Sequence, residues 1–577
     1  MPDPIKIANC SGFYGDRLSA MREQLEGGDL DVVTGDYLAE LTMLILARDT
    51  YRDASLGYAK TFVTQVEDCL GLAMERGVKI VSNAGGLNPA GLADKLREVA
   101  KALGLDANVA HVEGDDLRGS PALEAPNALS VNAYLGGFGI ARALTEGADI
   151  VVTGRVTDAS VVVGPAVAHF GWTPEQYDEV AGAVVAGHII ECGAQATGGN
   201  FSGFRSLPAA SRAKPLGFPI AEIAADGSCV ITKHAGTGGA VTVDTVTAQL
   251  VYEIQSARYL GPDVTTDLTS ISLEQDGEDR VRVSGIRGEA PPPQLKVCVN
   301  ELGGHRNMVE FVLTGLDIEA KAEWVQAQFE AGLGDNAPSS LSWSRSDTAH
   351  PDAASEEAAS TILRCIARDL KPEPVGKAFS SAAVELALAS YPGFTMTAPP
   401  GRGAPYGVYR PAYVDRDAVT HTVVLADGTR ITIDDPSVGP GLDGPDRTGL
   451  RVSPYPAPQD SVTRNVPLGR FVHARSGDKG GDANLGLWVM HDGSEKYADR
   501  VTWLSKLITP KKIRELIPEA ADLEVEVYTL PNLGGVNVLI RGLLGEGVSS
   551  STRFDPQAKG LGEWVRSRLV HIREELL

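Results

Sequence analysis

The chain has 577 residues, 43% of them hydrophobic and 22% charged, and it carries a formal net charge of −23. This length predicts several domains, and the acidic balance argues against a nucleic-acid surface, which needs clustered Lys and Arg. No run of about 18 apolar residues is present to span a bilayer, and the N-terminus lacks the order of a signal peptide, so we expect a cytoplasmic protein without a membrane partner.

Residues 1–260 are expected to form an α/β domain with a mostly parallel sheet and flanking helices. Short β-rich runs alternate there with longer helical ones, a pattern typical of sheets covered on both faces. The strands are predicted at residues 5–9, 31–34, 78–82, 108–112 and 149–153. Because ligands bind at the carboxyl edge of such sheets, we expect the turns that follow these strands to lie together and to form a site.

These turns supply many of the candidate site residues. The first, at 9–17, is dense in polar side chains, and the third, at 82–89, carries two glycines that allow close approach to a ligand. Asp36 could instead cap the following helix, and Arg155 could simply pair with Asp158. The candidates for binding substrate are Asn9, Ser11, Gly12, Tyr14, Arg17, Asp36, Asn83, Gly85, Gly86, Asn88 and Arg155, and Asp158 is a catalytic candidate.

No metal or cofactor is expected from the sequence. The six cysteines have no zinc-ligand spacing and fit reduced thiols. His188, Glu191 and Cys192 lie on neighbouring turns of a predicted helix at 174–196, but they lack the H-E-x-x-H order and are interpreted as packing residues. The glycine run at 236–240 lacks the third glycine of a dinucleotide-binding turn, and the sequence has no ATP-binding P-loop.

Residues 261–455 are expected to form a second, α+β lobe packed on the first domain. Helices are predicted at 318–332 and 356–369, and a hairpin at 420–433 turns at the Asp-Gly pair 427–428. Residues 436–459 have the composition of a linker.

Residues 463–577 are expected to form a small α+β domain that ends in a helix at 561–577. A loop is predicted between a strand ending at Val472 and another starting at Leu485. Its glycines can arrange N–H groups into an anion-binding nest, although an ordinary hairpin turn would also explain them. The catalytic candidates here are His473, Asp478 and Lys479, and the binding candidates are Arg475, Ser476, Gly480, Gly481, Asp482 and Asn484.

Five stretches of the chain are specific enough to compare with a known family. They are I-A-N-C-S-G-F-Y-G-D-R at 7–17, D-Y-L-A-E at 36–40, N-A-G-G-L-N-P at 83–89, T-G-R-V-T-D at 153–158 and A-R-S-G-D-K-G-G-D-A-N at 474–484. Together they resemble the acyclic terpene utilization (AtuA-like) family, and the last resembles the signature of that family's ferredoxin-like domain. The resemblance implies cytoplasmic breakdown of acyclic terpenoids or branched acids as CoA thioesters, alongside biotin-dependent acyl-CoA carboxylases.

Two functional hypotheses follow. In the first, the protein is a hydratase or lyase acting on an acyl-CoA, with His473, Asp478 and Lys479 transferring protons and backbone N–H groups near 85–86 or 480–481 stabilising an oxyanion. In the second, it is a non-catalytic acyl-CoA-binding partner of a carboxylase. We also expect a homo-oligomer, and a single site in which the turns at 9–17 and 154–158 cover the loop at 475–484.

Overall fold

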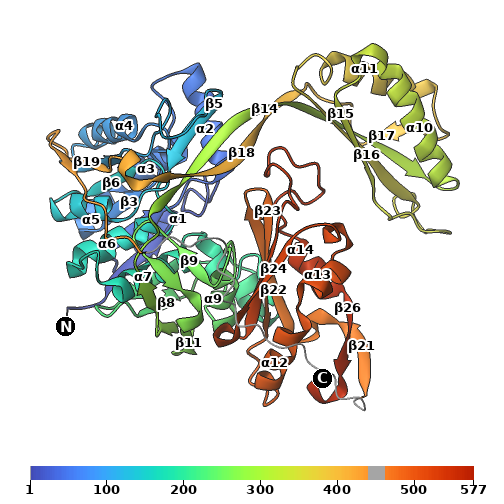
Figure 1. The fold of residues 1–577 in the computed structure, drawn as a ribbon. Helices are drawn as coiled ribbons and strands as arrows, with labels where there is room; N and C mark the ends of the chain where they lie inside the picture. Colours follow the sequence, from blue (N-terminus) through green and yellow to red (C-terminus); the bar gives the residue numbers. More distant parts are fainter. Residues whose placement is uncertain (1, 440–461) are drawn as a thin grey trace. The chain divides into compact units, whose positions relative to one another are not determined.

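The computed structural model describes residues 2–439 and 462–577, so most of the predicted linker lies outside the described residues. The first of two compact units contains the residues up to Asn300, Tyr409–Val548 and Asp555–Leu577, and the second contains Glu301–Val408 and Ser549–Phe554. The chain divides at other points than the predicted boundaries near 260 and 455, because strands β14 (Gln294–Thr314) and β18 (Ala404–Asp415) run through both units (Figure 1). Within the described ranges, no helix is both long and apolar enough to cross a membrane.

The first unit is built on a sheet with a parallel centre. Its central strands are, in spatial order, β1 (Ile5–Asn9), β2 (Val32–Gly35), β3 (Lys79–Ser82), β6 (Ile150–Thr153) and β4 (Val109–Glu113). They correspond to the predicted strands, and the predicted α/β fold with a mostly parallel sheet is confirmed. Because these strands are parallel, their carboxyl ends share one edge of the sheet.

Antiparallel strands extend this sheet on both sides. On the β1 side follow β7 (Pro219–Ile223), β8 (Cys229–Lys233), β12 (Val281–Ser284) and β11 (Ser272–Gln275). On the β4 side follow β19 (Thr422–Val424) and β20 (Arg430–Thr432). The hairpin predicted at 420–433 is therefore present, but it belongs to the large sheet and not to a separate lobe.

Helices cover both faces of the parallel strands. One layer contains α1 (Ala20–Gly27), α3 (Lys60–Arg76) and α4 (Pro89–Ala102), and the other contains α5 (Phe138–Thr145), α6 (Ser160–Phe170) and α7 (Tyr177–Ile190). Successive side chains of a strand point to opposite faces, so in β1 Ala8 packs in the first layer and Ile7 in the second. Further elements of this unit are α2 (Glu40–Arg52), β5 (Ala128–Ala133), α8 (Ala209–Arg212), α9 (Val243–Leu250), β9 (Arg258–Leu260), β10 (Thr265–Asp267) and β13 (Arg287–Glu289).

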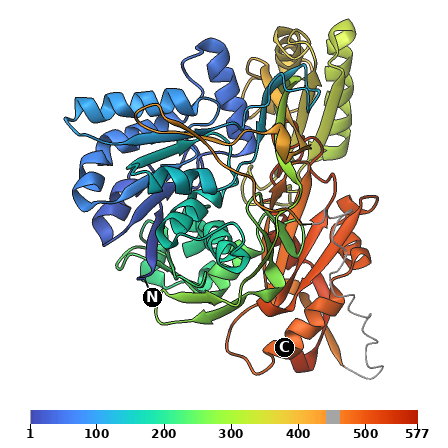
Figure 2. The ribbon, with the colours of Figure 1, turned by 60° about the vertical axis from the view of Figure 1, so that its left-hand side comes forward.

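The C-terminal part of the first unit, orange to red in Figure 2, forms an antiparallel sheet of its own. Its strand order is β22 (Val472–Lys479), β23 (Asp482–Val489), β25 (Gly535–Ile540) and β24 (Val525–Leu530), and the helices on it are α12 (Tyr497–Leu507), α13 (Pro510–Leu516) and α14 (Leu561–Ser567). The opposite face packs on the segment that contains α9, where Trp488 Nε1 donates to Asp244 at 3.0 Å. The sheet is therefore covered on both faces.

The loop predicted at 473–484 is wrong. These residues continue strands β22 and β23, and the turn between the two strands is formed by Gly480 and Gly481. The polar side chains misled the prediction because one face of β22 contacts polar groups of the same unit and not an apolar core. Its alternation of polar and apolar residues was therefore read as the composition of a loop.

Two predicted helices are also wrong. Residues 360–369 of the segment predicted as a helix at 356–369 form strand β16 (Ser360–Asp369), in which Leu363 and Cys365 are buried and Ile362 is exposed. In the terminal segment α14 stops at Ser567, and β26 (Leu569–Arg573) pairs with β21 (Thr463–Pro467). In both segments burial alternates with a period of two, which favours a strand over a helix.

The second unit is a small sheet, and two of its described helices pack on it. Its strand order is β15 (Ser340–Arg345), β16, β14 and β17 (Thr395–Met396), and its helices are α10 (Ile318–Leu333) and α11 (Lys377–Glu385). The predicted helix at 318–332 is confirmed as α10. Phe311, Phe329 and Phe379 form the aromatic centre of this unit.

The buried carboxyl group of Asp263 should make the stability of the first unit depend on pH. Its Oδ2 accepts the N–H of Gly137 at 2.7 Å, and burial raises its pKa to about 6. The folded state thus binds this proton more tightly than the unfolded chain, so the associated stability is present below about pH 4 and is lost as the pH rises through 6. Asp263→Asn removes this loss and should be up to about 3 kcal/mol more stable than wild type near pH 7.5.

Thermal or urea unfolding at about pH 4 and pH 7.5 checks this prediction. Asp427→Asn provides a control of opposite sign, because hydrogen bonds from Thr429 lower the pKa of Asp427 in the exposed turn after β19. Its replacement should reduce stability at neutral pH. A stability difference between Asp263→Asn and wild type that does not change with pH would contradict the prediction.

Candidate functional site

A buried polar side chain follows each of the central parallel strands. These side chains belong to Asn9, Asp36, Asn83, Asp115 and Arg155, none of which is more than 6% exposed. Polar groups at this edge are held by the backbone of neighbouring turns: Asn9 Nδ2, for example, donates to the carbonyl oxygens of Ser11 and Glu191. The turns after the parallel strands therefore lie at one edge of the sheet, as predicted. Their buried polar side chains form a polar site at this edge.

Asp36 is fixed by three backbone and side-chain groups. Asn83 Nδ2 and the N–H of Leu38 donate to its Oδ1 at 2.6 Å and 3.0 Å, and its own N–H donates to Ser11 O at 3.0 Å. Helix α2 begins later, with Ala39 at its N-cap position. The alternative interpretation of Asp36 as a helix cap is therefore wrong, and its carboxylate is turned toward the site.

Arg155 is a buried cation with several partners. Its Nη1 donates to Leu38 O and pairs with Asp158 Oδ1, each at 2.9 Å, and its guanidinium lies over the ring of Tyr134, 4.3 Å from the ring centre. The backbone N–H of Arg155 donates to Asp115 Oδ2 at 2.8 Å. The ion pair between Arg155 and Asp158, which the sequence analysis considered as an alternative to ligand binding, is therefore present. It is one of several contacts that hold the Arg155 guanidinium at the end of the strand.

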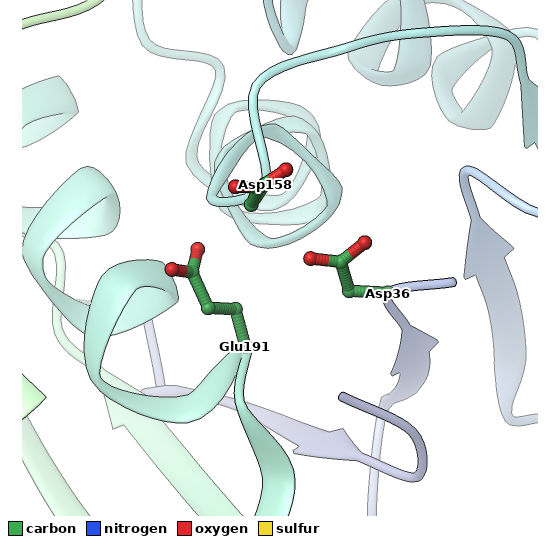
Figure 3. Close-up of side chains that lie close together, drawn as sticks. All are labelled: Asp36, Asp158 and Glu191. Atoms are coloured by element: carbon green, nitrogen blue, oxygen red, sulfur yellow. The ribbon is translucent and has the colours of Figure 1, made fainter. Parts of the chain in front are cut away.

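Three carboxylates converge beside Arg155. Asp36, Asp158 and Glu191 each place one oxygen within 4.8 Å of the other two, and Figure 3 shows them arriving from different segments. Burial and the charge of Asp158 raise the pKa of Asp36 and of Glu191 well above the usual range, and Arg155 opposes both shifts. Such a set can share protons, or its oxygens can hold a divalent cation.

Glu191 was interpreted from the sequence as a packing residue, and its helix explains this interpretation. Helix α7 is buried on all sides, as a run of Ala, Gly, Val and Ile suggests, and Glu191 follows its last residue. His188 Nδ1 lies 3.3 Å from Glu191 Oε1, and burial together with the ammonium of Lys479 lowers the pKa of His188 to about 4. The packing interpretation suits the helix but misses the carboxylate at its end.

Lys479 brings the C-terminal domain into this site. Along β22 the side chains of His473, Arg475 and Lys479 share one face, and a side chain at Gly477 would overlap the ring of Tyr252. The ammonium of Lys479 lowers the pKa values of Glu191 and His188, so its charge is felt at the carboxylate cluster. The close approach at Gly477 is what allows the strand to lie against this part of the unit.

Glu253, Tyr252 and Lys559 were not predicted. Asn484 Oδ1 accepts the N–H of Glu253 at 2.7 Å, and Lys559 Nζ lies 3.4 Å from Glu253 Oε1 and above the Tyr252 ring. Burial would raise the pKa of Glu253, but Lys559 and Lys479 lower it. Glu253 has a left-handed backbone, with φ of 54°, and no sequence pattern distinguishes it.

The structure does not bring every candidate on the hairpin into the cluster. His473 contacts Ser202 at 3.0 Å in a separate cavity of about 1020 Å³, which also holds Asp244 and His491. The other contacts are Asp478 to Lys559, Arg475 to Asn200 and Gln195, Ser476 to Ala558, and Asp482 to Arg541. Gly480 and Gly481 form the turn, packed against Tyr409 and Gly545.

Several candidates in the strand-end turns have structural partners. Arg17 pairs with Glu23 at 2.7 Å, Tyr14 packs at the apolar core, and Asn88 caps α4 by accepting the N–H of Gly91. The N–H of Gly86 donates to Asn83 O, so the predicted oxyanion donor is used within its own turn. A cavity of about 410 Å³ is nevertheless lined by Gly86, Asn88, Asp115 and Asn132.

The glycines of these turns allow close packing around the cluster. A Cβ at Gly12 would lie 2.7 Å from the backbone of Cys192, and one at Gly85 would overlap the carbonyl of Thr153. Any larger residue would push apart the segments that carry Glu191 and Arg155. Gly12 and Gly85 therefore contribute to the site through space and not through a side chain.

Comparison with known proteins identifies two family models that match this chain. Residues 5–425 match the model of the acyclic terpene utilisation family protein AtuA, and residues 466–571 match that of the AtuA ferredoxin-like domain. No curated protein and no solved structure matched the chain. The first match covers most of the chain, and it includes the strand-end turns that carry the carboxylate cluster. The chain therefore belongs to the acyclic terpene utilisation family AtuA, and its C-terminal part is that family's ferredoxin-like domain.

Proposed function

We propose that the protein is an enzyme that adds water to, or removes water from, a CoA thioester of an acyclic terpenoid or branched acid. The single observation that carries this proposal is the convergence of the carboxylates of Asp36, Asp158 and Glu191 beside the buried guanidinium of Arg155. The ammonium of Lys479 also lowers the pKa of Glu191. Membership of the acyclic terpene utilisation family supports the substrate class. The reaction class rests on the residues alone.

The chemistry of hydration explains why these residues suit it. Addition of water to an unsaturated thioester needs a base near the attacking water, an acid near the α-carbon, and positive charge near the enolate oxygen. We assign proton transfer to Asp158 and Lys479 and stabilisation of the oxygen to Arg155, whose guanidinium is held in place by Leu38 and Tyr134. His473 is left out of this assignment because it contacts Ser202 in the other cavity, and Asp478 is left out because its carboxylate lies beside Lys559.

The hairpin β22–β23 supports the proposal by covering the site. Val472–Gly477 are buried, and Asn484 binds the backbone of Glu253. Charges under such a cover act at a lower effective dielectric than in open water, so Lys479 and Arg155 are better placed to stabilise a developing oxyanion. This role replaces the predicted anion-binding nest, because Gly480 of the hairpin turn packs against the ring of Tyr409 and Gly481 against the carbonyl oxygen of Gly545.

A substrate panel tests the proposal. Purified protein is incubated with unsaturated and 3-hydroxylated CoA thioesters of branched and terpenoid acids, and gain or loss of one water is followed by mass spectrometry. We expect wild type to convert at least one thioester and Asp158→Asn to convert it much more slowly. If every thioester stays unchanged and the protein co-purifies with a biotin-dependent acyl-CoA carboxylase, it is instead an acyl-CoA-binding partner of that enzyme.

A further inference from the structure

We propose that Asp36, Asp158 and Glu191 bind one divalent cation of the class that prefers oxygen ligands, such as Mg²⁺, Mn²⁺ or Ca²⁺. One oxygen from each carboxylate lies within 4.8 Å of the other two, and the three groups converge in Figure 3. Two ligands on opposite sides of one ion are about 4.2 Å apart for Mg²⁺ and about 5 Å apart for Ca²⁺. Oxygens within 4.8 Å of one another are therefore close enough for one ion to bind all three after small side-chain shifts.

Glu191 supplies a second and separate reason. It is 4% exposed, and its Oε2 has no hydrogen-bond partner among the residues that the structure describes. A buried oxygen without a partner is costly, and Glu191 also stands at the C-terminal end of α7, where the helix dipole already presents negative charge. A cation between Glu191 and the two aspartates would compensate both unfavourable terms.

Each proposed ligand also contacts a neighbouring side chain that orients its carboxylate. Asn83 donates to Asp36 Oδ1, Arg155 Nη1 pairs with Asp158 Oδ1, and His188 Nδ1 lies next to Glu191 Oε1. Outer partners of this kind orient the carboxylates that bind a metal ion. Three carboxylates also leave positions on a six-coordinate ion for water or a substrate oxygen.

This inference departs from the expectation that the sequence holds no metal site. That expectation considered His188, Glu191 and Cys192 as a local helical set, whereas the proposed partners of Glu191 come from the turns after β2 and β6. The ion would lie at the site of the proposed function. Its binding can be measured without a thioester, so the two proposals can fail independently.

The test is a titration of metal-free protein with MnCl₂, followed by electron paramagnetic resonance. We expect one Mn²⁺ per chain, displaced by MgCl₂ or CaCl₂. Glu191→Gln and Asp158→Asn should each weaken Mn²⁺ binding at least about tenfold. Asp276→Asn is the matched control, because Asp276 is an exposed carboxylate paired with Arg282, and its loss should leave Mn²⁺ binding unchanged.

A crystal of the wild-type protein soaked in MnCl₂ gives a measurement that does not depend on the folding of any variant. An anomalous peak between the carboxylates of Asp36, Asp158 and Glu191 supports the proposal. The proposal is overturned if wild type binds no Mn²⁺ up to about 1 mM, the weak end of protein sites for such ions. It is also overturned if Mn²⁺ binds only at other carboxylates.

Discussion

Lys479→Ala is expected to lower thioester turnover by about tenfold to a thousandfold, the usual loss for one proton-transferring or charge-stabilising group. Lys479 is the residue through which the ferredoxin-like domain reaches the carboxylate cluster, since its ammonium acts on Glu191, His188 and Glu253. Steady-state kinetics on the thioester identified by the panel measure the loss. Circular dichroism and the thermal midpoint should show that the variant remains folded.

Two variants on the same strand sharpen this result. His473→Ala removes a side chain from the same face of β22, but its contacts with Ser202 and Asp244 lie in the other cavity, so turnover should be retained. Asp478→Asn should cost less than Lys479→Ala, because Asp478 lies 3.9 Å from Lys559, which in turn pairs with Glu253. Equal losses for His473→Ala and Lys479→Ala would contradict the assignment of the site.

Arg155→Gln is expected to destabilise the protein by up to about 3–5 kcal/mol, the cost of removing one partner from a buried ion pair, because Arg155 is buried although its partner Asp158 is 26% exposed. Arg155 is 3% exposed and pairs with Asp158 at 2.9 Å, so its loss leaves carboxylates in a poorly solvated place without their nearest cation. The thermal midpoint should fall by several degrees. The double variant Arg155→Gln, Asp158→Asn should recover part of this loss, because neither charge remains.

Arg118→Ala is the matched control for Arg155→Gln. Arg118 pairs with Asp116 at 2.6 Å, a shorter distance than in the buried pair, but both side chains are more than 40% exposed. Solvent screens such a pair, and its removal should change stability by less than about 1 kcal/mol. If the two variants melt at the same temperature, the buried cation does not have the structural role given to it here.

The parallel sheet could be predicted because its strands are nearly continuous apolar runs between amphipathic helices. The hairpin β22–β23 could not be predicted, because its polar residues contact other segments of the same unit and not solvent. In β22 Arg475 contacts Asn200 O on one face, and on the other face Ser476 contacts Ala558 O after the core residues Val472 and Ala474, so the apolar side of the strand is short. Strands β16 and β26 were also missed. Their buried and exposed residues alternate with a period of two, but the composition of both segments also suited helices.

The candidate site divides in the same way. Asp36, Asn83, Arg155 and Asp158 were predictable because each follows a strand at the ligand-binding edge. Glu191 and Glu253 were not, because their roles depend on partners from distant segments: Asp158 and Asp36 for the first, Lys559 and Asn484 for the second. Lys479 was predicted, but its place at the end of β22, paired with Asp482, follows from the strand register and not from a loop.

The most direct test of a single active site is a crystal structure with a stable acyl-CoA thioester analogue bound. We expect the carbonyl oxygen of the analogue to lie within hydrogen-bonding distance of Arg155 or Lys479, with the acyl chain next to Asp158 and Glu191. An analogue whose thioester group lies instead in the cavity of His473 and His491, away from the carboxylate cluster, would contradict it.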